Sequence, residues 1–161
     1  MLCRHVEPGD SPILEAAVGT GMVGDLLSGF GYENLVGIDL SDDMLAIARH
    51  KNLYSDLLRM RLGGALDFPD NHFAASLIVG AFTPGHAPPE SMPELVRVTR
   101  PGAPIIFTLR VDGGAAEPFI ALQNSLEEQG LWSQIEKTSP MNMMPLSEPD
   151  VFHRVFVYQV S

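Results

Sequence analysis

Residues 13–24 read ILEAAVGTGMVG, an apolar run that leads into a glycine-rich loop. The apolar part predicts a buried β-strand over residues 12–17, and residues 22–28 have the pattern of a helix. A turn between a parallel strand and a helix lies at the carboxyl edge of the sheet, where open sheets bind ligands. We therefore expect residues 19–21 to hold an anionic group through backbone amides and the helix N-terminus.

This loop fits two kinds of cofactor. Its last six residues spell G-x-G-x-x-G, the pattern that holds a dinucleotide pyrophosphate. Glu15 argues against a dinucleotide, because a carboxylate in a buried strand is unfavourable unless a cation lies near it. S-adenosylmethionine carries two such cations, an ammonium and a sulfonium. Asp39, eighteen residues after Gly21, can accept both hydroxyls of a ribose and suits either cofactor. In a third interpretation the glycines only make a tight turn.

The rest of the chain alternates between strand-like and helical patterns. Strands are predicted at 12–17, 34–39, 57–62, 74–79 and 104–110, and helices at 22–28, 42–50, 89–98 and 116–129. This alternation predicts a parallel sheet with helices on both faces. Two further strands, at 133–138 and 154–160, have no helix between them and must run antiparallel if they pair. The predicted fold class is α/β, a single domain with a seven-stranded, mostly parallel sheet.

Composition limits the partners of the chain. Its 161 residues include ten Lys and Arg against twenty Asp and Glu, a formal net charge of −10, with no basic cluster for nucleic acid or anionic membranes. The single cysteine and the absence of metal-ligand spacing argue against a metal site. No apolar run could span a bilayer, and the first ten residues do not resemble a signal peptide. We expect a cytoplasmic protein that acts on a small-molecule substrate, with no nucleic acid, membrane or metal.

Four segments resemble the class I S-adenosylmethionine-dependent methyltransferases. In chain order they are LEAAVGTG, GIDLSDDMLAIAR, FAASLIVGAF and ELVRVTRPGAPIIFTLR, and the resemblance runs from about residue 13 to residue 110. Within the class, the chain is most similar to the methyltransferase-like proteins. The resemblance implies a Rossmann-like three-layer sandwich, in which the antiparallel last strand is inserted beside the fifth. It also implies S-adenosylmethionine as cofactor and S-adenosylhomocysteine as product.

The resemblance implies roles for individual residues as well. The cofactor would be bound by Glu15, Ala17, Gly19, Thr20 and Gly21 at its methionine part, Asp39 at the ribose, Leu40, Gly64, Ala65 and Leu66 at the adenine, and Ala81 and Phe82 near the methyl group. An O- or N-nucleophile on the acceptor needs a base. The best placed candidate is His86, in the loop FTPGHAPP after the fourth strand, and the alternative is a solvated histidine without a role.

The chain also departs from the family pattern. Ala17 replaces the usual first glycine, and the triplet that usually contains an acid for the adenine reads Gly63, Gly64, Ala65, which leaves Asp67 as a candidate replacement. About a dozen residues precede the first strand, where relatives carry several tens that close over the cofactor. We therefore expect missing lid helices, with an open site, a covering partner such as the second copy of a homodimer, or a truncated chain.

Three functions remain open at this point. The first is methyl transfer from S-adenosylmethionine to a small molecule. The second is a catalytically weak or inactive domain that binds the cofactor or a partner, and the third is an NAD-binding oxidoreductase. One further segment, SPMNMMPLSEPD between the last two strands, is either a plain loop or an apolar lip over a pocket.

Overall fold

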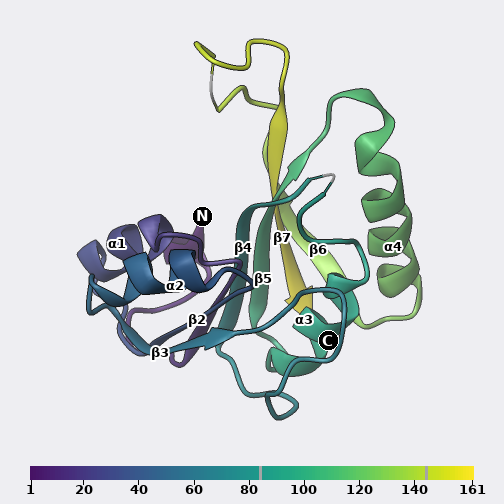
Figure 1. Cartoon of the computed structure of the whole chain (residues 1–161). Helices are drawn as coiled ribbons and strands as arrows, with labels where there is room; N and C mark the ends of the chain where they lie inside the picture. Colours follow the sequence, from purple (N-terminus) through teal and green to yellow (C-terminus); the bar gives the residue numbers. More distant parts are fainter. Residues whose placement is uncertain (84, 144) are drawn as a thin grey trace.

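The computed structural model of the protein describes residues 1–83, 85–143 and 145–161 (Figure 1). These residues form one sheet of β1 (Ile13–Ala16), β2 (Leu35–Asp39), β3 (Tyr54–Arg59), β4 (Ala75–Phe82), β5 (Pro104–Arg110), β6 (Trp132–Lys137) and β7 (His153–Val160). The helices are α1 (Met22–Gly29), α2 (Asp42–Arg49), α3 (Ser91–Val98) and α4 (Glu117–Glu128), with 3-10 turns η1 (Leu2–Arg4) and η2 (Gly113–Ala116).

The strand order is β3-β2-β1-β4-β5-β7-β6. Strands β1 to β5 pair in parallel, and β7 pairs antiparallel with both β5 and β6. The predicted α/β class and the antiparallel insertion of the last strand beside the fifth are therefore confirmed. The predicted bounds of β3 are wrong, because the strand begins three residues earlier than expected. It is an edge strand with mostly exposed side chains, so no buried alternating pattern fixes its position in the sequence.

Helices cover both faces of the sheet (Figure 1). On one face, Leu27 of α1 packs in a cluster with Ile13 and Leu77, and Leu2 and Val6 of the N-terminal segment complete that cluster. This N-terminal segment therefore packs on the same face of the sheet as α1. The described residues contain no helix that is both long and apolar enough to cross a membrane.

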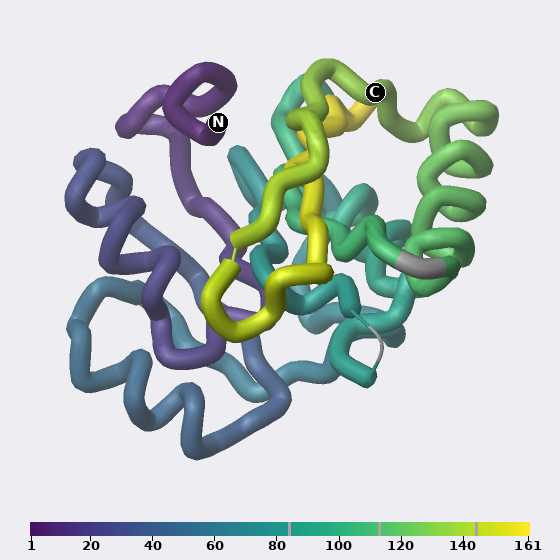
Figure 2. Tube along the Cα trace, turned by 90° about the horizontal axis from the view of Figure 1, so that it is seen from above, coloured from purple at the N-terminus to yellow at the C-terminus, as the bar shows by residue number. Residues whose placement is uncertain are grey.

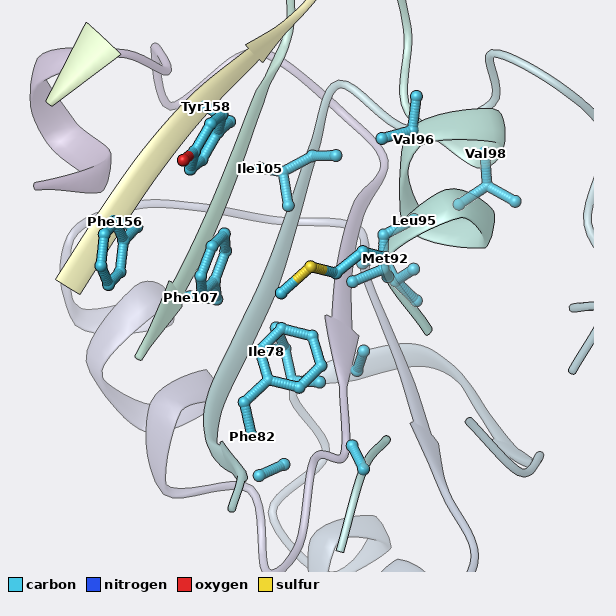
Figure 3. Packing of buried hydrophobic residues seen from close by; sticks show 14 of the residues in the cluster. Ile78, Phe82, Met92, Leu95, Val96, Val98, Ile105, Phe107, Phe156 and Tyr158 are labelled. Atoms are coloured by element: carbon cyan, nitrogen blue, oxygen red, sulfur yellow. The ribbon is translucent and has the colours of Figure 1, made fainter. Parts of the chain in front are cut away.

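The larger core lies on the other face, under α3 and α4. Figure 3 shows Phe107 of β5 beside Phe156 and Tyr158 of β7, with Phe82 of β4 on its other side. The ring centroids of Phe107 and Phe82 are 5.4 Å apart, and those of Phe107 and Tyr158 are 5.8 Å apart. Such aromatic packing holds the carboxyl ends of β4 and β5 in fixed positions.

Local signals in the sequence set the helix ends. Ser41 caps α2, because its hydroxyl accepts a hydrogen bond from the Met44 amide at 3.3 Å. Gly130 has a φ of 71°, and this left-handed conformation terminates α4. The connection between β6 and β7 projects beyond the carboxyl edge of the parallel strands (Figures 1 and 2).

Candidate active site

A cavity of about 930 Å³ opens at the carboxyl edge of the parallel strands. Its lining comes from the segments that follow β1, β2, β3 and β4, and from the start of α4. This volume is near the upper end for small-molecule sites, and the position is the one that an open parallel sheet offers to ligands. Among the sequence-predicted residues, the lining includes Ala17, Asp39, Leu40, Ala81 and His86.

The loop after β1 has a left-handed backbone at three positions. The φ angles are 58° at Ala17, 55° at Gly19 and 77° at Gly21. Glycine adopts this conformation freely, whereas alanine at residue 17 is disfavoured by about 1 kcal/mol. A Cβ built on Gly19 would meet nothing within 4 Å, so the outer side of this loop is open to a ligand. The loop leads into α1, whose first amides lack partners within the helix and favour a carboxylate.

Asp39 joins the end of β2 to this loop. Its Oδ2 atom accepts a hydrogen bond from the Gly19 amide at 2.8 Å, and its Oδ1 atom accepts one from the Ser41 amide at 2.9 Å. Each carboxylate oxygen has two acceptor positions. Asp39 can therefore accept two more hydrogen bonds at the cavity, enough for the two hydroxyl groups of a ribose. The residues present fit the nucleoside part of the expected cofactor.

Glu15 lies on the face of the sheet that α1 covers, and not in the cavity lining. Successive side chains of a strand alternate between faces, and Glu15 of β1 points to the α1 face, outside the cavity lining. The Glu15 side chain is 3% exposed, and its Oε2 atom accepts a hydrogen bond from the Tyr54 hydroxyl at 2.7 Å. Burial raises the pKa of the Glu15 carboxyl to about 7, although the Tyr54 hydrogen bond and the charge of Lys51 oppose this rise.

Tyr54 also explains the third glycine of the G-x-G-x-x-G pattern. A Cβ built on Gly24 would lie 2.1 Å from the Tyr54 Oη atom, so only glycine lets α1 approach the start of β3 this closely. Lys51 secures the same region, because its ammonium group donates to the Gly21 carbonyl at 3.1 Å and pairs with Asp25. The pattern therefore reflects packing at Gly24 as well as access for a ligand at Gly19.

The segment after β3 lines the cavity with different residues from those expected. Residues 60–62 form part of the wall, whereas residues 64–66 do not. Because β3 ends at Arg59, the chain reaches the cavity earlier than a strand over 57–62 would allow. Leu66 is instead buried, and its amide donates to the Glu94 carboxylate at 2.7 Å. Asp67, the candidate replacement for the missing adenine acid, also lies outside the lining.

A β-bulge shapes the end of β4. The register against β5 shifts between Ile78 and Phe82, and Gly80 has a φ of 73°. The Gly80 amide donates to the Thr108 hydroxyl of β5 at 2.7 Å, which holds the bulge in place. Bulges redirect side chains next to active sites. Here Ala81 lines the cavity, while Phe82 is fully buried in the aromatic core and outside the lining.

The loop after β4 brings a polar pair to the cavity. The His86 Nδ1 atom lies 3.0 Å from the Thr83 Oγ1 atom, and both residues belong to the lining. Sequence reasoning selected His86 and missed Thr83, although the three-residue spacing in the loop is one that allows this contact. Pro88 of the same loop packs against Gly63 of the segment after β3, because a Cβ on Gly63 would lie 2.5 Å from the Pro88 Cγ atom.

Comparison with known proteins decides the family. Residues 14–107, more than half of the chain, match the family described as a methyltransferase domain. The chain belongs to the class I S-adenosylmethionine-dependent methyltransferases. Human methyltransferase-like protein 27 is 37% identical over 129 residues, which are 78% of this methyltransferase chain and 52% of the human protein. A demethylmenaquinone methyltransferase of Symbiobacterium thermophilum is 34% identical in an alignment of 109 residues, which covers 63% of this chain and 43% of that protein.

Solved structures support the same fold. A crystal structure of an S-adenosylmethionine-dependent methyltransferase from Methanosarcina mazei superposes with a TM-score of 0.78, covering 99% of this chain and 96% of its own. Its sequence is 13% identical, so this likeness concerns the fold alone. The methyltransferase chain spans about half the length of the curated relatives it matches.

Proposed function

We propose that this chain transfers a methyl group from S-adenosylmethionine to a small-molecule acceptor. The observation that carries the proposal is that one cavity joins the Asp39 carboxylate to the Thr83–His86 pair. S-adenosylmethionine supplies an electrophilic methyl group when it is bound. The chain then needs to hold the cofactor, align a nucleophile with the methyl group and accept a proton where the nucleophile carries one.

The cofactor half of the cavity is proposed to be the part next to β1, β2 and β3. Asp39 accepts the ribose hydroxyls through its remaining lone pairs, and Leu40 packs on the adenine with the apolar side chains of Met60 and Leu62. The amides of residues 17–21 and the N-terminus of α1 bind the methionine carboxylate. For Glu15, contact with the methionine ammonium stays a prediction: its carboxyl lies outside the described cavity lining, and one of its oxygens accepts from Tyr54.

The acceptor half is proposed to lie between the loop after β4 and the start of α4. Ala81, Pro118 and Phe119 give it an apolar wall, and Thr83 and His86 are its polar groups. For a hydroxyl acceptor, His86 would accept the hydroxyl proton, and the bound cofactor would supply the methyl group that replaces it. An acceptor that is largely apolar and carries one nucleophilic group suits this wall. The named quinone acceptor of the Symbiobacterium thermophilum relative supports a compound of this kind.

Calorimetry on the wild-type chain with S-adenosylmethionine, S-adenosylhomocysteine and NAD tests the cofactor. We expect the first two to bind and NAD not to bind. Asp39→Asn should weaken S-adenosylhomocysteine about tenfold or more, because an amide offers fewer acceptor positions to the ribose. The matched control Asp43→Asn removes an exposed carboxylate outside the lining and should leave the affinity unchanged.

Binding of NAD in place of S-adenosylhomocysteine would contradict the proposal, as would an Asp39→Asn protein that binds like wild type. Melting temperatures of both variants show whether a loss of affinity reflects a loss of fold. Turnover of a radiolabelled methyl donor with a panel of hydroxylated metabolites then tests the transfer itself. Cofactor binding with no methylated product across that panel would favour a binding domain over an enzyme.

A further inference from the structure

The cavity has an unusual balance of charge for this protein. The chain contains twenty acidic residues, yet the lining residues that the structure describes include one carboxylate, that of Asp39. Hydrogen bonds from the Gly19 and Ser41 amides already engage both oxygens of that carboxylate. The acceptor positions that remain on Asp39 are those proposed above for the ribose hydroxyls, so a positively charged acceptor would find no further carboxylate among the described lining residues.

A cation is available in the same lining. Arg61 follows β3 and lines the cavity, and its exposed side chain has no hydrogen-bond or ion-pair partner among the described residues. Arg97 and Lys51 pair with Glu94 and Asp25, whereas three basic residues lack such a partner among the described residues, as Arg61 does, but lie outside the cavity lining: Arg100, Lys137 and Arg154. Among the described residues, Arg61 is the unpaired basic side chain that lines the cavity, and its guanidinium is available to an anion.

The segments that carry Arg61 and His86 contact each other beside the cavity. Gly63, two residues after Arg61, has a φ of 93° and packs directly against Pro88, two residues after His86. A side chain on residue 63 would clash with the Pro88 ring at 2.5 Å, so the two loops meet with no space between them. Arg61 and His86 therefore lie on neighbouring segments of the lining, each two residues from this contact.

We propose that Arg61 binds an anionic oxygen group of the acceptor, so that the substrate class is an apolar molecule with a carboxylate, phosphate or similar group. The proposal rests on the function proposed above. The bound cofactor is itself a sulfonium cation, and it adds to the positive field of Arg61. An anionic acceptor is attracted by both charges, whereas a cationic one is repelled by both. The planar guanidinium matches the oxygens of such a group through paired hydrogen bonds.

Two dyes that differ in one charged group test this assignment. Anilinonaphthalene sulfonate has an apolar ring system with a sulfonate, and phenylnaphthylamine has the same rings without it. Both are titrated by fluorescence into the full chain in the presence of saturating S-adenosylhomocysteine. We expect wild type to bind the sulfonate dye about tenfold more tightly than the neutral dye, the effect of one charged hydrogen-bonded contact.

Arg61→Gln should abolish this preference and leave the affinity for the neutral dye unchanged. Arg61→Lys should keep part of the preference, because it retains the charge and loses the planar fork. The matched control is Arg100→Gln, which removes an exposed arginine that lies outside the lining. It should bind both dyes like wild type.

Three results would overturn the inference. In the first, wild type shows no preference between the dyes. In the second, Arg61→Gln and Arg100→Gln change the preference equally, so that only the net charge matters. In the third, Arg61→Gln weakens S-adenosylhomocysteine and leaves the dye preference intact, which assigns Arg61 to the cofactor. Failure of wild type to bind S-adenosylhomocysteine at all would overturn the proposed function, and this inference with it.

Discussion

The buried carboxyl of Glu15 makes the stability of this protein depend on pH. Burial raises its pKa from 4.5 to about 7 in the folded chain. The folded state therefore binds the proton more tightly than the unfolded state, and the free energy of unfolding falls as pH rises from about 4.5 through 7. The difference between the two pKa values corresponds to about 3 kcal/mol, all of which is lost at pH values well above 7.

Glu15→Gln removes this titration and keeps an oxygen that accepts from the Tyr54 hydroxyl. Thermal unfolding of variant and wild type is compared at pH 5 and pH 8.5. We expect similar melting temperatures at the lower pH and a more stable variant at the higher one, by roughly 6 to 12 °C for a chain of this size. The other titrating groups are common to both proteins, so the difference between them isolates Glu15.

The matched control is Glu33→Gln, which changes an exposed carboxylate in the same way. Its difference from wild type should be small and independent of pH. A Glu15→Gln difference that stays constant between the two pH values would refute the reasoning. So would a wild type that gains stability over Glu15→Gln as the pH rises, because that result requires a carboxylate stabilised in its charged form.

Two further substitutions test the packing that shapes the site. Gly24→Ala should lower the free energy of unfolding by about 1 to 3 kcal/mol in denaturant titrations, because its Cβ would overlap the Tyr54 hydroxyl. In the same helix, Gly29→Ala meets nothing within 4 Å and should be neutral or slightly stabilising; equal losses for both would refute the overlap. Thr108→Val should cost about 1 kcal/mol by removing the acceptor of the Gly80 amide, and Thr108→Ser should not, whereas equal stability of the two variants would argue against the bulge contact.

Much of the fold and part of the site could be predicted from local patterns. The apolar run before Gly19 and the acid at Asp39 both follow buried central strands, whose hydrophobicity marks their ends within a residue or two. Because parallel strands end at one edge, two residues that are far apart in sequence could be placed at a common site. His86 follows β4, and the cavity lining includes it together with Asp39 for the same reason.

Other features depend on packing that no local pattern records. The face of β1 to which Glu15 points follows from which neighbours cover the sheet, and the Tyr54 hydroxyl that meets it comes from an edge strand. The position of β3 depends on Tyr54 packing over Gly24, a contact between residues thirty positions apart. The cavity wall is formed by residues 60–62 and not 64–66 because β3 ends at Arg59.

The central claim is that the cavity below the glycine loop holds the nucleoside of S-adenosylmethionine on Asp39. A crystal structure of the chain grown with S-adenosylhomocysteine tests it most directly. We predict the ribose hydroxyls within hydrogen-bond distance of the Asp39 carboxylate and the adenine against Leu40. A ligand bound elsewhere, or a carboxylate that contacts only the Gly19 and Ser41 amides beside an empty cavity, would contradict the account.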